Sequence, residues 1–415
     1  MRIQLVPRAA RADFLDLPWH EPLEEWRSTR LVEVPRGIGR HVVRFVDCAG
    51  TFVALKELPP EVAQREYRLL RELALRGIAA VDPVGVVGER ARSGEEHLPD
   101  VLITRYLDFS LPYRLALARR PLPDQLERLL DAFAQLLVRL HLSGFFWGDC
   151  SLSNALFRRD AGELAAYLVD AETGELHPRL SDGQRRYDVE IAEENVFGEL
   201  LDVQAEHDRE DPDEAVALAA EIPARYERLW SELTAEEELR LDETGRLEAR
   251  LRRLNELGFD AGEVELVQTP TGFRLRLEPK VMEPGHHRRR LLHLTGLDAQ
   301  ENQARRLLAD VDAYRRRLEA GSAPPASETA AAGRWLAEVF EPAIAAVPPE
   351  LRGKRDAAQL YHELLDHRWY LSERAGQEVP LADAVASYVE TVLRQLPDER
   401  TLLGSEADPD GIGFG

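Results

Sequence analysis

The sequence predicts an α+β protein with more than one domain, in which an antiparallel sheet comes first and helices follow. Three observations predict this class. The chain has 415 residues and 44% of them are hydrophobic, which is enough for two or three packed cores. Alternating apolar residues separated by glycine-containing turns occur in the first quarter of the chain. Farther along, apolar residues recur mostly at helical spacing.

The expected sheet has five strands and one inserted helix. The strand patterns lie at Leu31–Val34, His41–Val46, Thr51–Lys56, Val84–Val87 and Val101–Tyr106. After the third strand, Pro59-Pro60 breaks the pattern, and the apolar spacing is helical from Glu61 to Arg76. Residues 1–30 are expected to be a polar lead-in.

Helices dominate the next part of the chain. We expect a helix over Leu126–Ser143, a strand-loop-strand block over Phe145–Leu176, and a helix over about Tyr187–Gln204. The acidic, proline-bearing stretch Asp208–Asp213 is expected to be the main domain boundary.

The second half should combine helices with one β-hairpin. Ala215–Leu257 is expected to be helical with breaks near Pro223 and around Thr244-Gly245. The strands of the hairpin, Glu263–Val267 and Phe273–Leu277, flank a turn at Thr269–Gly272. Helices are expected again over Asp298–Glu319 and over most of Ala330–Leu396. The expected regions are therefore a lead-in (1–30), a first domain (31–206), an α+β domain (214–320), a helical region (328–403) and a disordered tail (404–415).

Composition excludes several classes of protein. The formal charge of −22 argues against a general nucleic-acid binder, because phosphate backbones favour clustered basic residues. With only Cys48 and Cys150, neither a disulfide framework nor a cysteine zinc site is expected. No apolar run approaches the roughly 18–20 residues of a membrane span, so a cytoplasmic protein is expected. The basic cluster His286–Arg290 is expected to start a solvated helix; a nucleic-acid site there is the alternative.

Lysine is scarce. Only Lys56, Lys280 and Lys354 are lysines among 53 basic residues, and all the others are arginines. A lysine that remains in such a chain indicates a place where a compact ammonium cannot be exchanged for a guanidinium. This singles out Lys56, at the end of the third strand.

Five residues have the chemistry that phosphoryl transfer from a nucleotide requires. That reaction needs a cation on the phosphates, oxygen ligands for Mg²⁺, and a carboxylate near the acceptor hydroxyl. Lys56 is followed ten residues later by Glu66 in the helix. Asp149 and Asn154 are five residues apart in one loop, and Asp170 ends a short apolar strand.

In this order, after a sheet, these residues resemble the protein-kinase-like fold. The motifs Gly148–Asn154 and Val169–Glu172 are closer to the small-molecule and lipopolysaccharide (Kdo) kinase branches than to eukaryotic protein kinases. The downstream half resembles a domain of unknown function that actinobacterial proteins carry behind a lipopolysaccharide-kinase-like domain. The segments Met282–Arg290 and Leu360–Tyr370 suggest it.

The resemblance implies a two-lobed fold over about Leu31–Gln204, with a five-stranded antiparallel N-lobe and a mainly helical C-lobe, followed by the α/β-hairpin and helical C-terminal region. It implies ATP and Mg²⁺ as cofactors. The implied roles are Lys56 on the phosphates, Glu66 paired with Lys56, Gly37 and Gly39 in the loop over the phosphates, Asp149 as the catalytic carboxylate, Asn154 and Asp170 as Mg²⁺ ligands, and Glu172 as a further metal contact.

Two departures from the family pattern leave an alternative open. Trp147 stands where the family often has histidine, and the glycine loop is only Gly37-x-Gly39. The leading hypothesis is an ATP- and Mg²⁺-dependent phosphotransferase acting on a hydroxyl of a sugar, a lipid-linked sugar or another small molecule. The alternative is a pseudokinase that senses nucleotide or binds a protein partner through its C-terminal half.

Overall fold

The chain folds into two compact units in the computed structural model. Described are residues 1–6, 12–32, 41–48, 50–92, 97–117, 123–207, 211–234, 237–239, 259–269, 272–281, 286–320, 327–396 and 399. Unit 1 comprises Met1–Leu107, Leu111–Phe157 and Ala166–Pro284. Unit 2 comprises Asp108–Ser110, Arg158–Ala165 and Gly285–Gly415. The predicted tail 404–415 lies outside the described residues.

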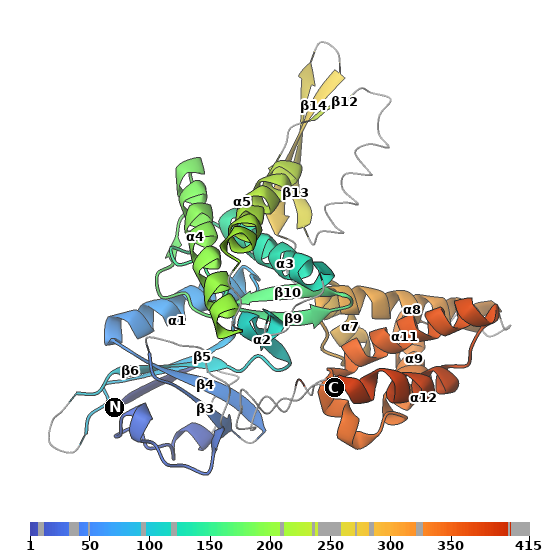
Figure 1. Ribbon diagram of the computed structural model, residues 1–415, viewed down its shortest axis with the longest axis horizontal. Helices are drawn as coiled ribbons and strands as arrows, with labels where there is room; N and C mark the ends of the chain where they lie inside the picture. The colour runs from blue at the N-terminus through green and yellow to red at the C-terminus, as the bar shows by residue number, and fades with distance from the viewer. Residues whose placement is uncertain are drawn as a thin grey trace. The chain divides into compact units, whose positions relative to one another are not determined.

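Unit 1 begins with an antiparallel sheet of six strands in the order β1-β5-β6-β4-β3-β2. Its strands β3 to β6 are labelled in Figure 1. The strands are β1 (Arg2–Leu5), β2 (Leu31–Val32), β3 (Val43–Cys48), β4 (Thr51–Leu58), β5 (Pro83–Gly88) and β6 (Asp100–Arg105). In β4, Lys56 lies opposite Val43 of β3 and Leu102 of β6. The sheet thus holds Lys56 between two neighbouring strands.

The prediction of five strands was wrong by one. The additional strand, β1, comes from the segment expected to be a polar lead-in, and it pairs with β5. The same segment also buries Phe14, Trp19, Leu23 and Trp26 against strands of the sheet. A four-residue edge strand and aromatic residues at irregular spacing carry little periodic signal, so the sequence did not reveal this layer.

Helix α1 (Pro60–Leu75) packs against β5 and β6. Proline at the first helical position suits its start, and Gly77, with φ +68°, follows its end. Ala63, Tyr67 and Leu70 are buried on its inner face, and each large apolar side chain there contributes about 2 kcal/mol. Glu66 lies on the same buried face.

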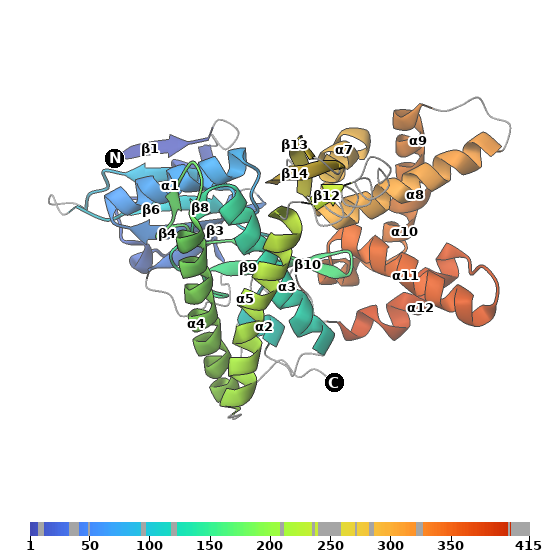
Figure 2. The same cartoon turned by 90° about the horizontal axis from the view of Figure 1, so that it is seen from above.

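Helices form the rest of the core of unit 1, together with short strands. The helices are α2 (Tyr113–Leu117), α3 (Pro123–Leu142), α4 (Asp182–Glu206) and α5 (Pro212–Thr234). The strands are β7 (Ser110–Pro112), β8 (Phe145–Phe146), β9 (Ala155–Asp160), β10 (Glu163–Leu168) and β11 (Glu175–Leu176). Of these, Ser110 of β7, residues 158–160 of β9 and residues 163–165 of β10 belong to unit 2. Helices α4 and α5 lie side by side, and α3 packs against α5 (Figures 1 and 2).

Two helices differ from their predicted bounds. Helix α4 begins at Asp182 rather than near Tyr187, because Ser181 and Gln184 form a capping box that starts it earlier. Helix α5 continues through Pro223, although a break was expected there. Residues on both sides of Pro223, such as Ile222 and Tyr226, are buried. Their packing stabilises the helix and compensates for the hydrogen bond that proline cannot donate.

The β-hairpin of the second half is confirmed. Its strands are β13 (Phe259–Thr269) and β14 (Gly272–Val281), which pair antiparallel on either side of the predicted turn. A third strand, β12 (Glu237–Leu239), pairs with β14 and lies where a helix was expected. This part of the helical prediction was wrong.

The described part of unit 2 is mainly helical (Figure 1). Its elements are α7 (His286–Thr295), α8 (Glu301–Ala320), α9 (Glu328–Trp335), η4 (Leu336–Phe340), α10 (Glu341–Ala345), η5 (Pro349–Lys354), α11 (Ala357–Ala375), α12 (Leu381–Thr391) and η6 (Leu393–Gln395). One core cluster is built around Trp335, Phe340 and Tyr361. In the parts of the chain that the structure describes, none of the helices combines the length and apolar character needed to cross a bilayer.

Candidate active site

The candidate site is centred on the ammonium of Lys56. Its Nζ lies 2.7 Å from Oδ2 of Asp170 and 3.2 Å from Oε2 of Glu66. Oε2 of Glu172 is 3.6 Å away. The ammonium of Lys56 comes from the sheet, and the carboxylate of Glu66 comes from helix α1. The carboxylates of Asp170 and Glu172 come from the segment after β10, and all four groups lie close together.

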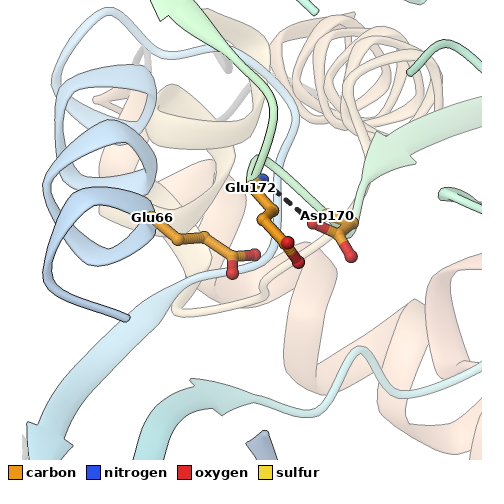
Figure 3. A group of neighbouring side chains, drawn as sticks. All are labelled: Glu66, Asp170 and Glu172. Carbon is orange, nitrogen blue, oxygen red and sulfur yellow. Dashed lines mark hydrogen bonds between the residues drawn. The ribbon is translucent and has the colours of Figure 1, made fainter. Parts of the chain in front are cut away.

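The three acidic side chains point toward one another (Figure 3). Ligand oxygens of Glu66, Asp170 and Glu172 all lie within 4.8 Å of one another. The backbone N–H of Glu172 donates to Oδ1 of Asp170 at 2.9 Å, and that of Ala171 donates to Oε1 of Glu66 at 3.3 Å. Carboxylate oxygens of this kind are donors that suit Mg²⁺. The donor set fits a divalent cation.

Glu66 is fully buried, and this affects its titration. Burial and the neighbouring Asp170 carboxylate raise the pKa of Glu66 to about 7, against the opposing effect of Lys56. The ammonium of Lys56 is thus the main compensation for a carboxylate held in the protein interior.

His41 adds a contact that the sequence did not suggest. Its Nε2 lies 2.8 Å from Oε2 of Glu172, and both side chains are partly exposed. The two residues are 131 positions apart, so no local pattern could have paired them. Glu172 therefore lies between the imidazole of His41 and the ammonium of Lys56.

Asp149 and Asn154 contact each other in the loop between β8 and β9. Nδ2 of Asn154 donates to the backbone carbonyl of Asp149 at 3.0 Å and to its Oδ2 at 3.2 Å. With Nδ2 used in this way, the amide oxygen of Asn154 is the atom that can face a ligand. The backbone carbonyl of Asn154 accepts from Val169 N at 3.0 Å, which joins the loop to the strand that leads to Asp170.

Trp147, the departure from the family pattern, links the same two segments. It is fully buried, and its indole N–H donates to the backbone carbonyl of Asp170 at 3.1 Å. Its own carbonyl accepts from Oγ1 of Thr173 at 2.8 Å. The indole thus holds the loop against the end of the apolar strand.

Sequence reasoning missed Asp188, a buried carboxylate of α4. Asp188 accepts from the backbone N–H groups of Trp147 and Gly148 at 2.7 and 2.8 Å. His141 lies 3.1 Å from it, and Nδ1 of His141 lies 2.8 Å from the hydroxyl of Tyr226. Burial lowers the pKa of His141, so the imidazole is neutral, donates to Asp188 and accepts from Tyr226.

Asn195 and Glu199, also on α4, were missed as well. Asn195 donates to the loop carbonyl of Cys150 at 3.0 Å, and Glu199 accepts from the backbone N–H groups of Leu152 and Ser153 at 2.8 Å. A signal existed, because residues 188, 195 and 199 are 7 and then 4 positions apart, the spacing of one helical face.

The structure brings together Lys56, Glu66, Asp170 and Glu172, and it joins Asp149 to Asn154. Gly37 and Gly39 lie outside the described residues. The roles inferred for all eight residues remain predictions.

Comparisons with known proteins match two segments of the chain. Residues 52–190 match the family model described as "Lipopolysaccharide kinase (Kdo/WaaP) family", and residues 228–393 match "Domain of unknown function (DUF4032)". No curated protein shows significant similarity to the chain. One similar solved structure is titled "WaaP in complex with acyl carrier protein", with 17% identity over 56% of this chain and 99% of that one and a TM-score of 0.36. The chain thus combines a segment that matches the lipopolysaccharide kinase (Kdo/WaaP) family model, residues 52–190, with a segment that matches the DUF4032 model, residues 228–393.

Proposed function

We propose that the protein is an ATP- and Mg²⁺-dependent phosphotransferase whose acceptor is a hydroxyl of a sugar, a lipid-linked sugar or another small molecule. The observation that carries the proposal is the contact of the Lys56 ammonium with both Glu66 and Asp170, inside the segment that matches a kinase family. A lysine held by a helix carboxylate is oriented to bind nucleotide phosphates.

Each group then has a task. Lys56 binds the phosphates, and Glu66 orients Lys56. Asp170 and the amide oxygen of Asn154 would hold Mg²⁺, with Glu172 as a further oxygen donor. When bound, the metal neutralises charge on the phosphates.

Asp149 acts at the acceptor. The hydroxyl oxygen of the acceptor forms a bond to the γ-phosphorus, the bond from that phosphorus to the bridging oxygen of ADP breaks, and the hydroxyl proton passes to the Asp149 carboxylate. Positioning of these groups and neutralisation of charge supply most of the acceleration.

The basic cluster at the start of α7 does not favour nucleic acid as a partner. Three of its side chains contact acids of unit 2: Nε of Arg288 lies 2.5 Å from Asp298, Nε of Arg290 lies 3.0 Å from Glu328, and Nδ1 of His287 lies 2.7 Å from Glu301. A binding site for phosphate backbones requires basic groups that acids do not already compensate. A protein partner for the C-terminal half stays a prediction.

The proposal predicts the effect of Asp149→Asn. Because the acceptor is unidentified, water serves as the acceptor and release of inorganic phosphate from ATP is measured. We expect at least a 100-fold lower rate, since the amide cannot take the proton, while the affinity for ATP with Mg²⁺ stays within about twofold.

Two results would contradict parts of this proposal. Unchanged phosphate release in Asp149→Asn would contradict the role of Asp149. Nucleotide binding by the wild type, without phosphate release and without transfer to any sugar hydroxyl tested, would favour the pseudokinase instead.

A further inference from the structure

One face of helix α4 contacts most of the loop that contains Asp149 and Asn154, which we call the catalytic loop. The loop runs from Trp147 to Asn154, and the helix residues are Asp188, Asn195 and Glu199. At 3.6 residues per turn, positions 7 and 11 residues apart point in nearly the same direction. Asp188 anchors the start of the loop, whereas Asn195 and Glu199 contact the part that contains Asp149.

Asn195 holds one oxygen of the Asp149 carboxylate. Its Nδ2 lies 3.5 Å from Oδ1 of Asp149 and donates to the carbonyl of Cys150 at 3.0 Å. The other carboxylate oxygen, Oδ2, accepts from Nδ2 of Asn154 at 3.2 Å. With an amide donor on each oxygen, the plane of the carboxylate is restrained, and with it the direction in which Asp149 meets an acceptor.

Glu199 holds the backbone of the same loop. Its two carboxylate oxygens accept one hydrogen bond each, from Leu152 N and Ser153 N, both at 2.8 Å. Hydrogen bonds from backbone N–H groups to a carboxylate are among the stronger ones in proteins. They keep the chain from Asp149 to Asn154 in the bend that turns both side chains to the site.

We propose that Asn195 and Glu199 are positioning residues for the phosphoryl transfer, with Asn195 setting the orientation of Asp149 and Glu199 setting the course of the loop. Both lie beyond residue 190, where the match to the kinase family ends. The inference rests on the proposed function for its catalytic part, but the restraint on the loop is a property of the chain without nucleotide.

The test uses the full-length protein and the variants Asn195→Ala and Glu199→Gln, with Glu194→Ala as the control. Glu194 is exposed on the same helix. Three quantities are measured: the affinity for ATP with Mg²⁺ by calorimetry, phosphate release from ATP with water as the acceptor, and hydrogen exchange of the backbone amides of residues 147–154 without nucleotide.

We expect Asn195→Ala to lower phosphate release about 10- to 100-fold while its ATP affinity stays within about twofold, since misplacement of a reacting group costs rate rather than binding. Glu199→Gln should speed exchange at Leu152 and Ser153 about tenfold or more and also lower phosphate release. Glu194→Ala should match the wild type in all three measurements.

The outcomes separate the inference from the proposed function. Unchanged exchange in Glu199→Gln, or unchanged phosphate release in both variants of an active protein, overturns the positioning roles. A wild type that does not bind ATP with Mg²⁺ overturns the proposed function and the catalytic part of the inference together. In that case faster loop exchange in Glu199→Gln still supports the restraint.

Discussion

Two of the three lysines have contacts that explain why arginine does not replace them. Lys56 lies among the carboxylates of Glu66, Asp170 and Glu172. Lys354 donates through Nζ to the backbone carbonyls of Arg394 and Leu396. A small ammonium with three donors fits between such oxygens, whereas a planar guanidinium needs a wider space. The side chain of Lys280 lies outside the described residues.

At the residue scale, Lys56→Met should destabilise the protein. The change leaves Glu66 buried beside Asp170 without its compensating cation. Because the pKa of Glu66 is about 7, the full cost of breaking a buried ion pair from one side, about 3 kcal/mol, is expected near pH 9, where this carboxylate is ionised. Urea unfolding should show this loss. Adding Glu66→Gln to Lys56→Met should recover most of it, because the buried charge is then removed too. A double variant as unstable as the single one would contradict this reading of the pair.

At the element scale, the cap of helix α4 can be tested by one exposed residue. Oγ of Ser181 accepts from Gln184 N at 3.2 Å, and Oε1 of Gln184 accepts from Ser181 N at 3.0 Å. Ser181→Ala should cost about 1 kcal/mol, which corresponds to a drop of roughly 2–4 °C in the melting temperature. Ser181→Asp, which keeps a cap acceptor, should melt near the wild type. Equal losses in the two variants would argue against the capping box.

Elements with strong local patterns were predicted from the sequence. The strands β3 to β6, the helix α1 and the β13–β14 hairpin lie within a few residues of their expected positions. The layer around Trp19 and Trp26 was missed because its contacts are tertiary and its spacing is irregular. Helix propensity also predicted a break at Pro223, but packing of α5 keeps the helix continuous there.

The contacts of the candidate site also divide into those that the sequence could predict and those that it could not. Lys56 and Glu66 could be paired from the sequence, because a strand followed by a helix brings residues ten positions apart together. The contacts of His41 with Glu172, and of α4 with the loop, join positions at least 40 residues apart. Only the spacing of 188, 195 and 199 could have suggested a functional face on α4.

At the scale of the whole molecule, the tip of the β9–β10 hairpin belongs to unit 2, where Asp160 caps helix α8. Its carboxylate accepts from Gln303 N at 2.8 Å and from the backbone and side-chain nitrogens of Asn302 at 3.2 and 3.1 Å. Burial raises the pKa of Asp160 from 3.8 to about 6, in spite of these hydrogen bonds.

The raised pKa predicts a pH dependence of unit 2. The folded state holds the proton of Asp160 more tightly than the unfolded state, so stability falls as pH rises from about 4 to about 6 and then levels off. A shift of this size corresponds to about 3 kcal/mol. Hydrogen exchange of α8, corrected for its intrinsic pH dependence, should show the fall in the wild type, whereas Asp160→Asn should lack it. The same fall in stability with pH in the wild type and in Asp160→Asn would assign the effect to another titrating group.

The central claim is a working site for nucleotide and metal built on Lys56 and Asp170, and calorimetry of ATP binding tests it most directly. It requires no knowledge of the acceptor. The wild type should bind ATP with Mg²⁺ at least tenfold more tightly than without it, and Asp170→Ala should lose this gain. Absence of ATP binding with and without Mg²⁺, or a gain that persists in Asp170→Ala, would contradict it.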